Sequence, residues 1–515
     1  MTENSRENVS RPEVGDTKGS PLGKQNATTD APDSASVIVE PQWINTRSEE
    51  QGEADARALF EEEFGDTPAG VWSAPGRVNL IGEHVDYALG ISIPFALTQR
   101  TYVAARLNGT DTYRVVSRYA PHTGEPAQNV RVEIPTGDVG VDDEGKGHPS
   151  HWAGYALGAI WAAREAGVIP PLSAPAVTEV DASAHTRTDS ACATDTEGAP
   201  AEASGVVSER SAFSAGIDLA IVSDVPVGAG LSSSAALECS SALAAYDLCA
   251  STFAHGATAE LSDEVRKGLM AASIRAENEV VGASTGGLDQ RISLFGRAGH
   301  ALAIDFLTDE ATHVPFDIAA SGKAILIINT NAPHQLNDGQ YASRRAVIDG
   351  VTEHLGVRSL RQAEDAVARS AAWAEANVPG GVNATEAEVS AWTDTVAKRV
   401  RHVVTEIERT ARAADMLRQG DLGAFGRAMC ASHESLRDDY EVTVPELDLA
   451  VDTAMACGAI GARMTGGGFG GSAIALLDVA LVEQTAQAIA QAFAQADFNA
   501  PEFVVATPSD GAHRH

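Results

Sequence analysis

Residues 226–238 read PVGAGLSSSAALE and join an apolar run to an alanine-rich segment. The preceding run, LAIVSDV at 219–225, has the β-branched content and the period expected of a strand. The following segment, AALECSSALAAYDL, carries apolar or small residues at helical spacing. We therefore expect a strand, a glycine turn, a serine cluster and a helix start in that order.

The glycine turn has the chemistry of an anion site. Gly228 and Gly230 let the backbone turn sharply and approach a ligand with no Cβ in the way. At the helix start that follows, unpaired N–H groups and the positive end of the helix dipole favour a phosphate. The hydroxyls of Ser232, Ser233 and Ser234 can donate to phosphate oxygens or coordinate a hard cation such as magnesium.

A plain strand-to-helix connection with a capping serine is the alternative for this stretch taken alone. The stretch lacks the GxxxxGK[ST] pattern, so it is not a Walker-type loop. Because the loop has no lysine, any cationic contribution to phosphate binding must come from another part of the chain.

The composition limits the possible partners. The chain has 515 residues, 44% of them hydrophobic, and is long enough for more than one core. Lys+Arg 37 against Asp+Glu 71 gives a formal net charge of -34, which argues against general nucleic-acid binding and against attraction to anionic membranes. A bound nucleotide would need local glycine N–H groups, magnesium or a few placed arginines.

Cysteine usage and the start of the chain favour a cytoplasmic location. The first residues have no apolar signal segment, and no run of about 18 apolar residues occurs. The five cysteines are far apart and form no CxxC pair, as expected for reduced thiols in a cytosolic protein; they are Cys192, Cys239, Cys249, Cys430 and Cys457.

Three segments are predicted to lie outside the packed domains. Residues 1–42 are polar and poor in aromatic side chains, so we expect a disordered tail, with ordered structure beginning near Ile44. Residues 173–214 form an acidic, low-complexity insertion within a domain, because patterned sequence resumes on both sides. Residues 508–515 are expected to form a frayed tail.

A second chemical stretch is SAPGRVNLIGEHVDY at residues 73–87. Arg77, Glu83, His84 and Asp86 crowd polar groups around a short apolar patch, and charges in such a place are costly to bury without partners. Carboxylates and imidazole can hydrogen-bond the hydroxyls of a small polyol, and arginine is suited to phosphate. A solvated loop after a strand is the alternative interpretation.

Three later segments add carboxylates and glycines. AENEVVGASTGGLDQ at 276–290 places Glu277 late in a helical pattern and Asp289 after a glycine pair; such carboxylates take a proton, hold a metal or simply lie on the surface. AILIIN at 324–329 is typical of a buried strand, and Tyr341 follows at a helix start. MTGGGFGGS at 464–472 is a second glycine-rich turn, which indicates a close backbone approach.

Together and in this order, the segments resemble the galactokinase family, within the group that also holds homoserine, mevalonate and phosphomevalonate kinases. GRVNLIGEHVDY at 76–87 is similar to the galactokinase signature, PVGAGLSSSAA to the shared phosphate loop, and TGGGFGGS to the third shared motif. AENxxVG with GGLDQ, NTN with YxxRR, and SHESLRDDYEV extend the similarity. It runs from about Trp43 to about Thr507 and leaves out the insertion and both tails.

The resemblance implies an α+β fold of two domains, with the active site in the cleft between them. We place the boundary near residue 315, so that 43–315 and 316–507 are the two kinase domains. The implied reaction transfers the γ-phosphate of ATP to the C1 hydroxyl of α-D-galactose, giving galactose 1-phosphate and ADP, with Mg²⁺ as the cofactor. Galactose and ATP are the expected partners of a monomer that binds neither nucleic acid nor membrane.

The resemblance also implies roles for single residues. Asp289 is the candidate base at the sugar hydroxyl, and Arg77 beside it would keep it ionised and stabilise charge on the transferred group. Because such a carboxylate is a weak base, we expect alignment to contribute more than proton abstraction. Ser234 and Glu277 match magnesium ligands. The galactose-contacting positions are Glu83, His84, Val85, Asp86, Gly286 and Tyr341, and the phosphate-binding positions are Gly228, Ala229, Gly230, Leu231, Ser232, Ser233 and Ser234.

Some positions differ from the usual family pattern and bear on the sugar that is preferred. Val85, Ala88 and Leu89 stand where the family more often has Thr and Asn-Gly, and GGLDQ replaces GIMDQ. The alternatives are a kinase for N-acetylgalactosamine or galacturonate, and a sensor that binds galactose and ATP without turnover. Glucose is expected to be a poor substrate, because an epimer leaves buried acceptors unpaired at about 1 to 3 kcal/mol each.

Overall fold

The computed structural model describes residues 39–119, 127–170, 215–251, 261–283, 285–333 and 338–515. Residues 39–515 belong to one compact unit. The expected insertion at 173–214, Cys192 and the first 38 residues of the expected tail lie outside the described residues. The other four cysteines, which lie in the described part of the chain, form no disulfide bond there. Within the described ranges, no helix combines the length and the apolar character needed to cross a membrane.

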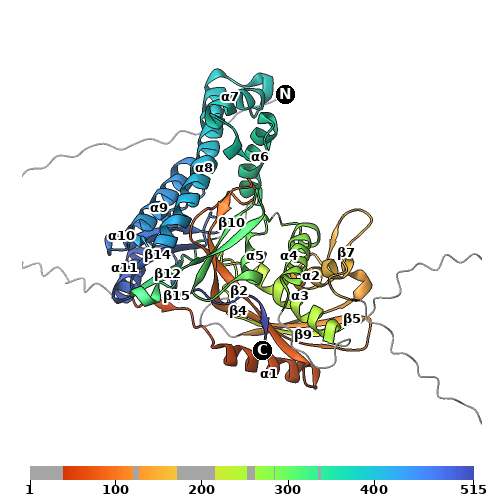
Figure 1. Cartoon of the computed structure of the whole chain (residues 1–515). Helices are drawn as coiled ribbons and strands as arrows, with labels where there is room; N and C mark the ends of the chain where they lie inside the picture. The colour runs from red at the N-terminus through yellow and green to blue at the C-terminus, as the bar shows by residue number, and fades with distance from the viewer. Residues whose placement is uncertain (1–38, 120–126, 171–214, 252–260, 284, 334–337) are drawn as a thin grey trace, which may run out of the picture. The chain divides into compact units, whose positions relative to one another are not determined.

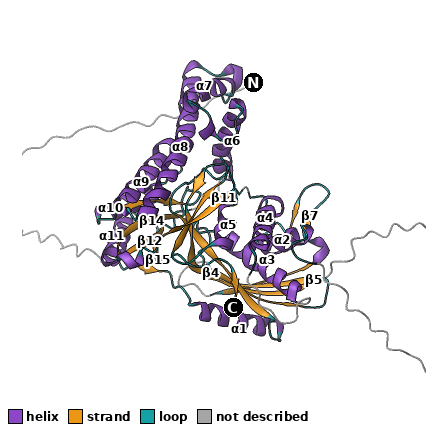
Figure 2. Cartoon of the chain, viewed as in Figure 1, coloured by secondary structure: helices purple, strands orange, loops and turns teal. Residues whose placement is uncertain are grey.

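The first sheet has six strands in the order β16-β2-β4-β9-β5-β6 (Figure 1, Figure 2). Only the β5–β9 pairing is parallel among these neighbours. β9 is the strand predicted before the glycine turn, and it confirms that prediction. The strands are β2 (Gly70–Asn79), β4 (Pro94–Leu107), β5 (Thr112–Tyr119), β6 (Gln128–Pro135), β9 (Ile217–Ser223) and β16 (His513–Arg514).

Both faces of this sheet are covered by helices, which explains why all ten residues of β2 are buried. Alternate residues face opposite sides: Trp72 packs with the α2, α3 and α4 side chains, whereas Val71 packs with Leu59 and Phe60 of α1. The helices are α1 (Glu49–Phe64), α2 (Ala153–Glu165), α3 (Ser233–Ser251), α4 (Asp263–Arg275) and α5 (Leu288–Phe295). Helix α1 begins at Glu49, directly after Ser48, which forms a capping box with Gln51.

The second sheet has five strands in the order β1-β15-β12-β14-β13. Its central strand β12 (Lys323–Asn329) confirms the predicted apolar strand at 324–329. The other strands are β1 (Gln42–Trp43), β13 (Gly461–Thr465), β14 (Ser472–Asp478) and β15 (Glu502–Ala506), and a smaller sheet holds β3 (Ile91–Ser92), β10 (His300–Asp305) and β11 (Glu310–Pro315).

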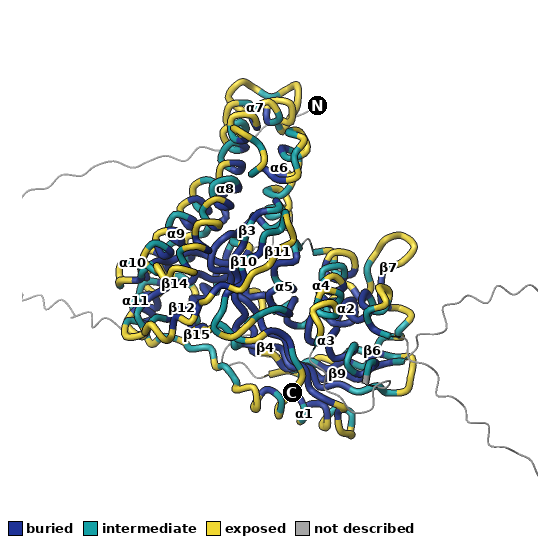
Figure 3. Tube along the Cα trace, in the orientation of Figure 1, coloured by how far each residue is buried: buried dark blue, intermediate teal, exposed yellow. Residues whose placement is uncertain are grey.

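Helices of the second half pack against the second sheet and against one another (Figure 1). Helix α8 is the longest element and runs past the loop that follows β2, as its hydrogen bonds to that loop show. Exposed residues gather on α1, α7 and the outer side of α8 (Figure 3). The helices are α6 (Asp338–Leu355), α7 (Ala366–Ala376), α8 (Glu386–Gln419), α9 (Leu422–Ser435), α10 (Pro445–Ala456) and α11 (Val482–Gln495).

One apolar cluster contains side chains from both large sheets. It holds Val78 and Phe95 of the first sheet together with Ile325 and Ile474 of the second. Phe425 of α9 packs in the same cluster. The domain boundary near residue 315 stays a prediction, because residues on either side of it share this core.

The prediction of a frayed tail at 508–515 is wrong. β16 pairs with β2 in the register His513 to Ser73, and Ala512 is 1% exposed. The buried guanidinium of Arg100 donates to the carbonyls of Asp510 and Gly511 at 2.8 and 2.7 Å. The polar composition of the segment hid these partners, because backbone acceptors are independent of side-chain type. At the other end, β1 extends the ordered chain two residues before Ile44.

Candidate active site

Arg77 lies at the end of β2, directly after a break in the strand register between Pro75 and Arg77. The break places Gly76 against the glycine turn, where an added Cβ would lie 2.6 Å from the Leu231 carbonyl oxygen. The Arg77 N–H donates to the same oxygen at 3.0 Å. The bulge therefore joins the first chemical stretch to the second.

The Arg77 guanidinium holds Asp289, the candidate base. Its Nε and Nη2 donate to Asp289 Oδ1 and Oδ2 at 2.9 and 3.0 Å, and its Nη1 donates to the Gly230 carbonyl. The Ser232 hydroxyl donates to Asp289 Oδ2 at 2.5 Å. The Asp289 side chain remains 23% exposed, so it can still meet a substrate. The structure thus brings the predicted base, arginine and phosphate loop together.

The predicted phosphate loop folds as a turn of left-handed residues leading into α3. Gly228, Gly230 and Ser232 have φ values of 78°, 71° and 61°. An added Cβ at Gly228 would meet nothing within 4 Å, so the backbone there faces open space. Ser233 and Ser234 lie in the first turn of α3, where helix N–H groups are available to an anion. Ala229 and Leu231 are buried and anchor the loop in the core that both sheets share.

The second glycine-rich stretch connects β13 to β14 and packs on the phosphate loop. An added Cβ at Gly466 would lie 2.9 Å from the Gly230 carbonyl oxygen, and one at Gly471 would lie 3.3 Å from that of Ala229. The Ser472 hydroxyl donates to the Ala229 carbonyl at 2.7 Å. The close backbone approach predicted for this stretch is made to the chain itself.

Glu277, a predicted metal ligand, lies beside a second carboxylate that the sequence did not single out. The Gln290 Nε2 donates to Glu277 Oε2 at 2.6 Å and to Glu238 Oε2 at 2.9 Å. Burial, then the charge of Asp289, raises the pKa of Glu277 to about 7, and a hydrogen bond from Ser234 opposes this rise. Burial, then Glu277, raises the pKa of Glu238 well above its usual value. Hydroxyl and carboxylate oxygens in this arrangement could hold a hard cation.

Two short π-helices carry site residues. One, η3 (Ala276–Val281), continues α4 and holds Glu277; the other, η7 (Leu436–Tyr440), continues α9 and ends at Tyr440. π-helical turns are rare and are found often at functional sites. Helical periodicity could not reveal them, because a single wide turn leaves the apolar spacing on either side nearly unchanged.

The loop after β2 presents His84 and Asp86 beside two other predicted sugar positions. The rings of His84 and Tyr341 have centroids 5.4 Å apart. An added Cβ at Gly286 would lie 2.2 Å from Asp86 Oδ2, so only glycine fits there. Burial, then Asp289, raises the pKa of Asp86 to about 6, and burial lowers that of His84 to about 3. His84 is therefore neutral at pH 7, and His84, Asp86, Gly286 and Tyr341 form one polar group next to Asp289.

Two predicted sugar-contacting residues, Glu83 and Val85, have side chains that contact the protein itself. Both carboxylate oxygens of Glu83 accept from the protein: Oε1 accepts from the Gly466 N–H at 2.7 Å, and Oε2 accepts from Asn79 Nδ2 at 2.9 Å. Val85 is fully buried in the core of the second half. The geometry favours a supporting role for both side chains, Glu83 as a clamp on the glycine hairpin and Val85 as an apolar anchor.

Helix α8 supplies further support that the sequence did not indicate. Glu406 Oε1 accepts from the Gly82 N–H at 2.9 Å and from the Ser432 hydroxyl at 2.6 Å. His402 Nε2 lies 3.2 Å from the Glu83 carbonyl oxygen. The contacts with Gly82 and Glu83 span more than 300 residues of chain, which is why local patterns could not reveal them.

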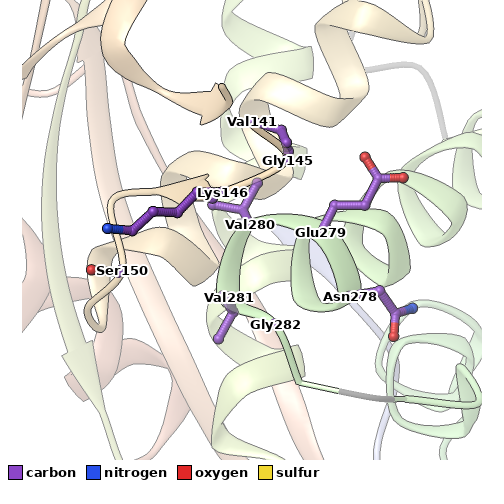
Figure 4. Close-up of a pocket in the computed structure, with 10 residues that line it drawn as sticks. Val141, Gly145, Lys146, Ser150, Asn278, Glu279, Val280, Val281 and Gly282 are labelled. Carbon is purple, nitrogen blue, oxygen red and sulfur yellow. The ribbon is translucent and has the colours of Figure 1, made fainter. Parts of the chain in front are cut away.

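A pocket of about 490 Å³ is lined in part by η3, from Asn278, the residue after Glu277, onward. Its side chains come from η3 and from the hairpin of β7 (Gly140–Val141) and β8 (Gly147–His148), as Figure 4 shows. The pocket contains none of the predicted site residues.

Comparisons with known proteins agree with this geometry. The galactokinase galactose-binding signature matches residues 58–107, and the N-terminal and C-terminal domains of the GHMP kinases match residues 201–297 and 413–496. The galactokinase of Streptomyces coelicolor is 38% identical over 466 residues, covering 90% of this chain and 99% of that protein. Human galactokinase is 36% identical over 432 residues, covering 82% of this chain and 88% of that protein.

A solved structure gives the same result. The crystal structure of Lactococcus lactis galactokinase complexed with galactose matches with a TM-score of 0.64 at 29% sequence identity, covering 89% of this chain and 99% of that chain. The predicted two-domain α+β fold and the predicted resemblance are confirmed. The chain belongs to the galactokinase family of ATP-dependent sugar kinases.

Proposed function

We propose that the chain transfers the γ-phosphate of ATP to the C1 hydroxyl of α-D-galactose and releases galactose 1-phosphate and ADP. The observation that carries this proposal is the contact of Asp289 with both Arg77 and Ser232. Ser232 and the Gly230 carbonyl bring the phosphate loop to this pair, and Asp289 is close enough to Asp86 for its charge to raise the pKa of Asp86. The family and the galactose-bound relative support the choice of sugar.

In the proposed reaction the C1 oxygen of the sugar forms a bond to the γ-phosphorus while the bond to the ADP oxygen breaks. The hydroxyl proton passes to Asp289, whose carboxylate Arg77 and Ser232 hold in one orientation. Arg77 also stabilises negative charge on the transferred group. Holding the two substrates in line contributes more than proton transfer in reactions of this class.

Ser234 and Glu277 would hold the magnesium ion, and the residues present fit it. Beyond the effect of burial, the charge of Asp289 raises the pKa of Glu277, and the charges of Glu277 and Asp289 raise the pKa of Glu238. A divalent cation offsets that repulsion. When bound, magnesium would neutralise part of the negative charge of the ATP phosphates.

The sugar would lie against Asp86, His84 and Tyr341. An ionised Asp86 accepts hydrogen bonds from hydroxyls. The single N–H of a neutral His84 lies at Nε2 and donates to the Gly467 carbonyl at 3.1 Å, so the other ring nitrogen is an acceptor. Galactose over glucose is the expected preference, because the epimer leaves one of these buried groups unpaired. A cytoplasmic monomer is the expected state, and light scattering after gel filtration measures its mass.

The deciding experiment measures ADP release with magnesium-ATP and galactose, beside glucose, N-acetylgalactosamine, galacturonate, mevalonate and homoserine. Asp289→Asn should lower kcat by about 10²–10⁴-fold while the protein stays folded. Asp309→Asn is the matched control, because that aspartate is exposed and pairs with Arg291. If another compound is phosphorylated and galactose is not, the substrate is that compound and the choice of galactose is wrong. Galactose binding without turnover would indicate a sensor and overturn the proposal.

A further inference from the structure

Three metal-ligating side chains meet far from Asp289 in the fold. Glu49 lies in the first turn of α1, and His513 and His515 lie at the C-terminal strand. One ligand atom from each of the three lies within 4.8 Å of the other two. The group involves neither the phosphate loop nor the sugar-binding loop.

The strand register explains why both imidazoles face Glu49. His513 pairs with Ser73, and the His515 N–H donates to the Val71 carbonyl at 2.9 Å, so the chain stays extended along β2. Residues two apart on a strand share a face. Arg514, between them, faces the other way and lies over the Trp72 ring at 5.1 Å. The two histidines therefore point to the side of the sheet that α1 covers.

The distances fit a coordinated ion better than a hydrogen bond. His513 Nε2 lies 3.6 Å from Glu49 Oε2, beyond normal hydrogen-bond length. Ligands at 2.0–2.1 Å from a tetrahedral ion lie roughly 3.4 Å apart. The opposite ring nitrogen, His513 Nδ1, lies 3.0 Å from the Gly511 carbonyl, and Ser73 Oγ lies 2.8 Å from His515 Nε2. Such contacts orient the imidazoles of metal sites.

Arg100 is the positive charge beside this group, and it opposes a cation. Its guanidinium donates to Ser73 Oγ and to two backbone carbonyls, and its Nη1 lies 3.9 Å from Glu49. Its Nη2 also lies 3.1 Å from His513 Nδ1, the ring nitrogen beside the Gly511 carbonyl, which leaves His513 Nε2 as the nitrogen that faces Glu49. Burial lowers the pKa of His515 to about 4 and lowers that of His513.

We propose that Glu49, His513 and His515 form a binding site for one divalent transition-metal ion of the zinc type, with water completing the coordination. Two imidazoles and a carboxylate suit Zn²⁺, Ni²⁺ or Cu²⁺, whereas Mg²⁺ prefers oxygen ligands. The ion would link the start of α1 to the end of the chain. Its expected effect is on the stability of this corner, since the reacting groups lie elsewhere.

The test titrates ZnCl₂ into metal-free full-length protein by calorimetry, with excess Mg²⁺ present to occupy oxygen-rich sites. We expect one Zn²⁺ per chain, a Tm that rises with added Zn²⁺, and visible bands of tetrahedral Co²⁺ when Co²⁺ replaces it. The double variant His513→Ala and His515→Ala should lose all three signals. Glu49→Gln should weaken binding at least tenfold.

The control is the double variant His300→Ala and His313→Ala, which removes another facing pair of imidazoles, with ring centroids 6.0 Å apart. It should bind Zn²⁺ as the unchanged protein does. Galactose-dependent turnover of each variant without Zn²⁺ shows that it is folded. Equal binding by the His513 and His515 variant, several weak sites of equal strength, or no binding at micromolar Zn²⁺ would each overturn the proposal.

Discussion

Asp86 illustrates how a binding residue can reduce stability. Burial, and then the charge of Asp289, raises its pKa from 3.8 to about 6. A carboxyl with a raised pKa in the folded state favours folding while protonated, and this contribution is lost as the pH rises through 6. At pH 7.5 the buried, ionised carboxylate therefore lowers the free energy of unfolding. A sugar hydroxyl that donates a hydrogen bond to it would offset this loss.

We expect Asp86→Asn to raise the free energy of unfolding of the ligand-free protein by about 1–3 kcal/mol at pH 7.5. At pH 4 the gain should largely disappear, because Asp86 is then protonated. The same change should raise the galactose KM at least tenfold. Urea denaturation at both pH values and steady-state kinetics measure these effects, with exposed Asp452→Asn as the control. An unchanged KM would remove Asp86 from the sugar site.

Glu277 should make the magnesium requirement depend on pH. Burial, then Asp289, raises its pKa to about 7, so a proton competes with the cation below that pH. We expect the free Mg²⁺ concentration for half-maximal rate to rise as the pH falls from 8 to 6, approaching tenfold per unit below 7. Rates measured against free Mg²⁺ test this. A half-saturation value that is the same at pH 6 and pH 8 would contradict it.

At the scale of elements, the two glycine-rich turns act as one unit. The β13–β14 hairpin lies on the phosphate loop through backbone contacts, and Glu83 joins the hairpin to the loop after β2. The bulge at Gly76 packs against the Leu231 carbonyl oxygen of the phosphate loop. Three segments that are distant in sequence are therefore positioned by backbone atoms, for which glycine is required.

We expect Gly466→Ala to lower kcat/KM for ATP and to destabilise the protein more than a left-handed glycine alone would. Its φ is 86°, and an added Cβ would lie 2.9 Å from the Gly230 carbonyl oxygen. Gly420→Ala is the control, because Gly420 has a φ of 71° with nothing within 4 Å and should cost about 1 kcal/mol. Kinetics and urea denaturation separate the two. Equal effects would show that the loop contact is unimportant.

At the scale of the whole molecule, each end of the described chain joins the sheet built mainly from the other half. β1, near the start, pairs with β15, and β16, at the end, pairs with β2. Both halves also share the core around Phe95 and Ile325. Cooperative unfolding of the two sheets together is the expected consequence.

Removal of residues 508–515 should lower the free energy of unfolding by about 3 kcal/mol or more, because the buried Arg100 guanidinium loses two carbonyl acceptors. Arg514→Ala, which keeps those carbonyls and removes only the contacts of the Arg514 side chain, such as those with Trp72 and Asp247, is the control. Urea denaturation followed by tryptophan fluorescence measures both. If the truncated protein is as stable as the full chain, residues 508–515 do not stabilise the fold and the prediction of a frayed tail holds.

Local chemistry was readable from the sequence wherever neighbouring residues share a role. The order of β9, the turn and α3, and the strand β12, followed from local patterns. The grouping of Arg77 with Asp289, 212 residues apart, was implied by the resemblance to the family. Glu238 could not be found in this way. It ends the stretch 226–238, near the start of α3, but no pattern there marks it as a site residue, and only its contact with Gln290, 52 residues later, places it beside Glu277.

The sequence by itself determined the family, the phosphate loop and the residues around the reacting groups, because these depend on glycine conformation and on side-chain types at short spacing. The tertiary structure alone decided that Glu83 clamps the glycine hairpin, that α8 holds the sugar loop through Glu406, and that the last residues close the first sheet. Those roles rest on contacts across hundreds of residues, mostly with backbone atoms. Every residue type carries the same backbone groups, so no local pattern records which of them will meet.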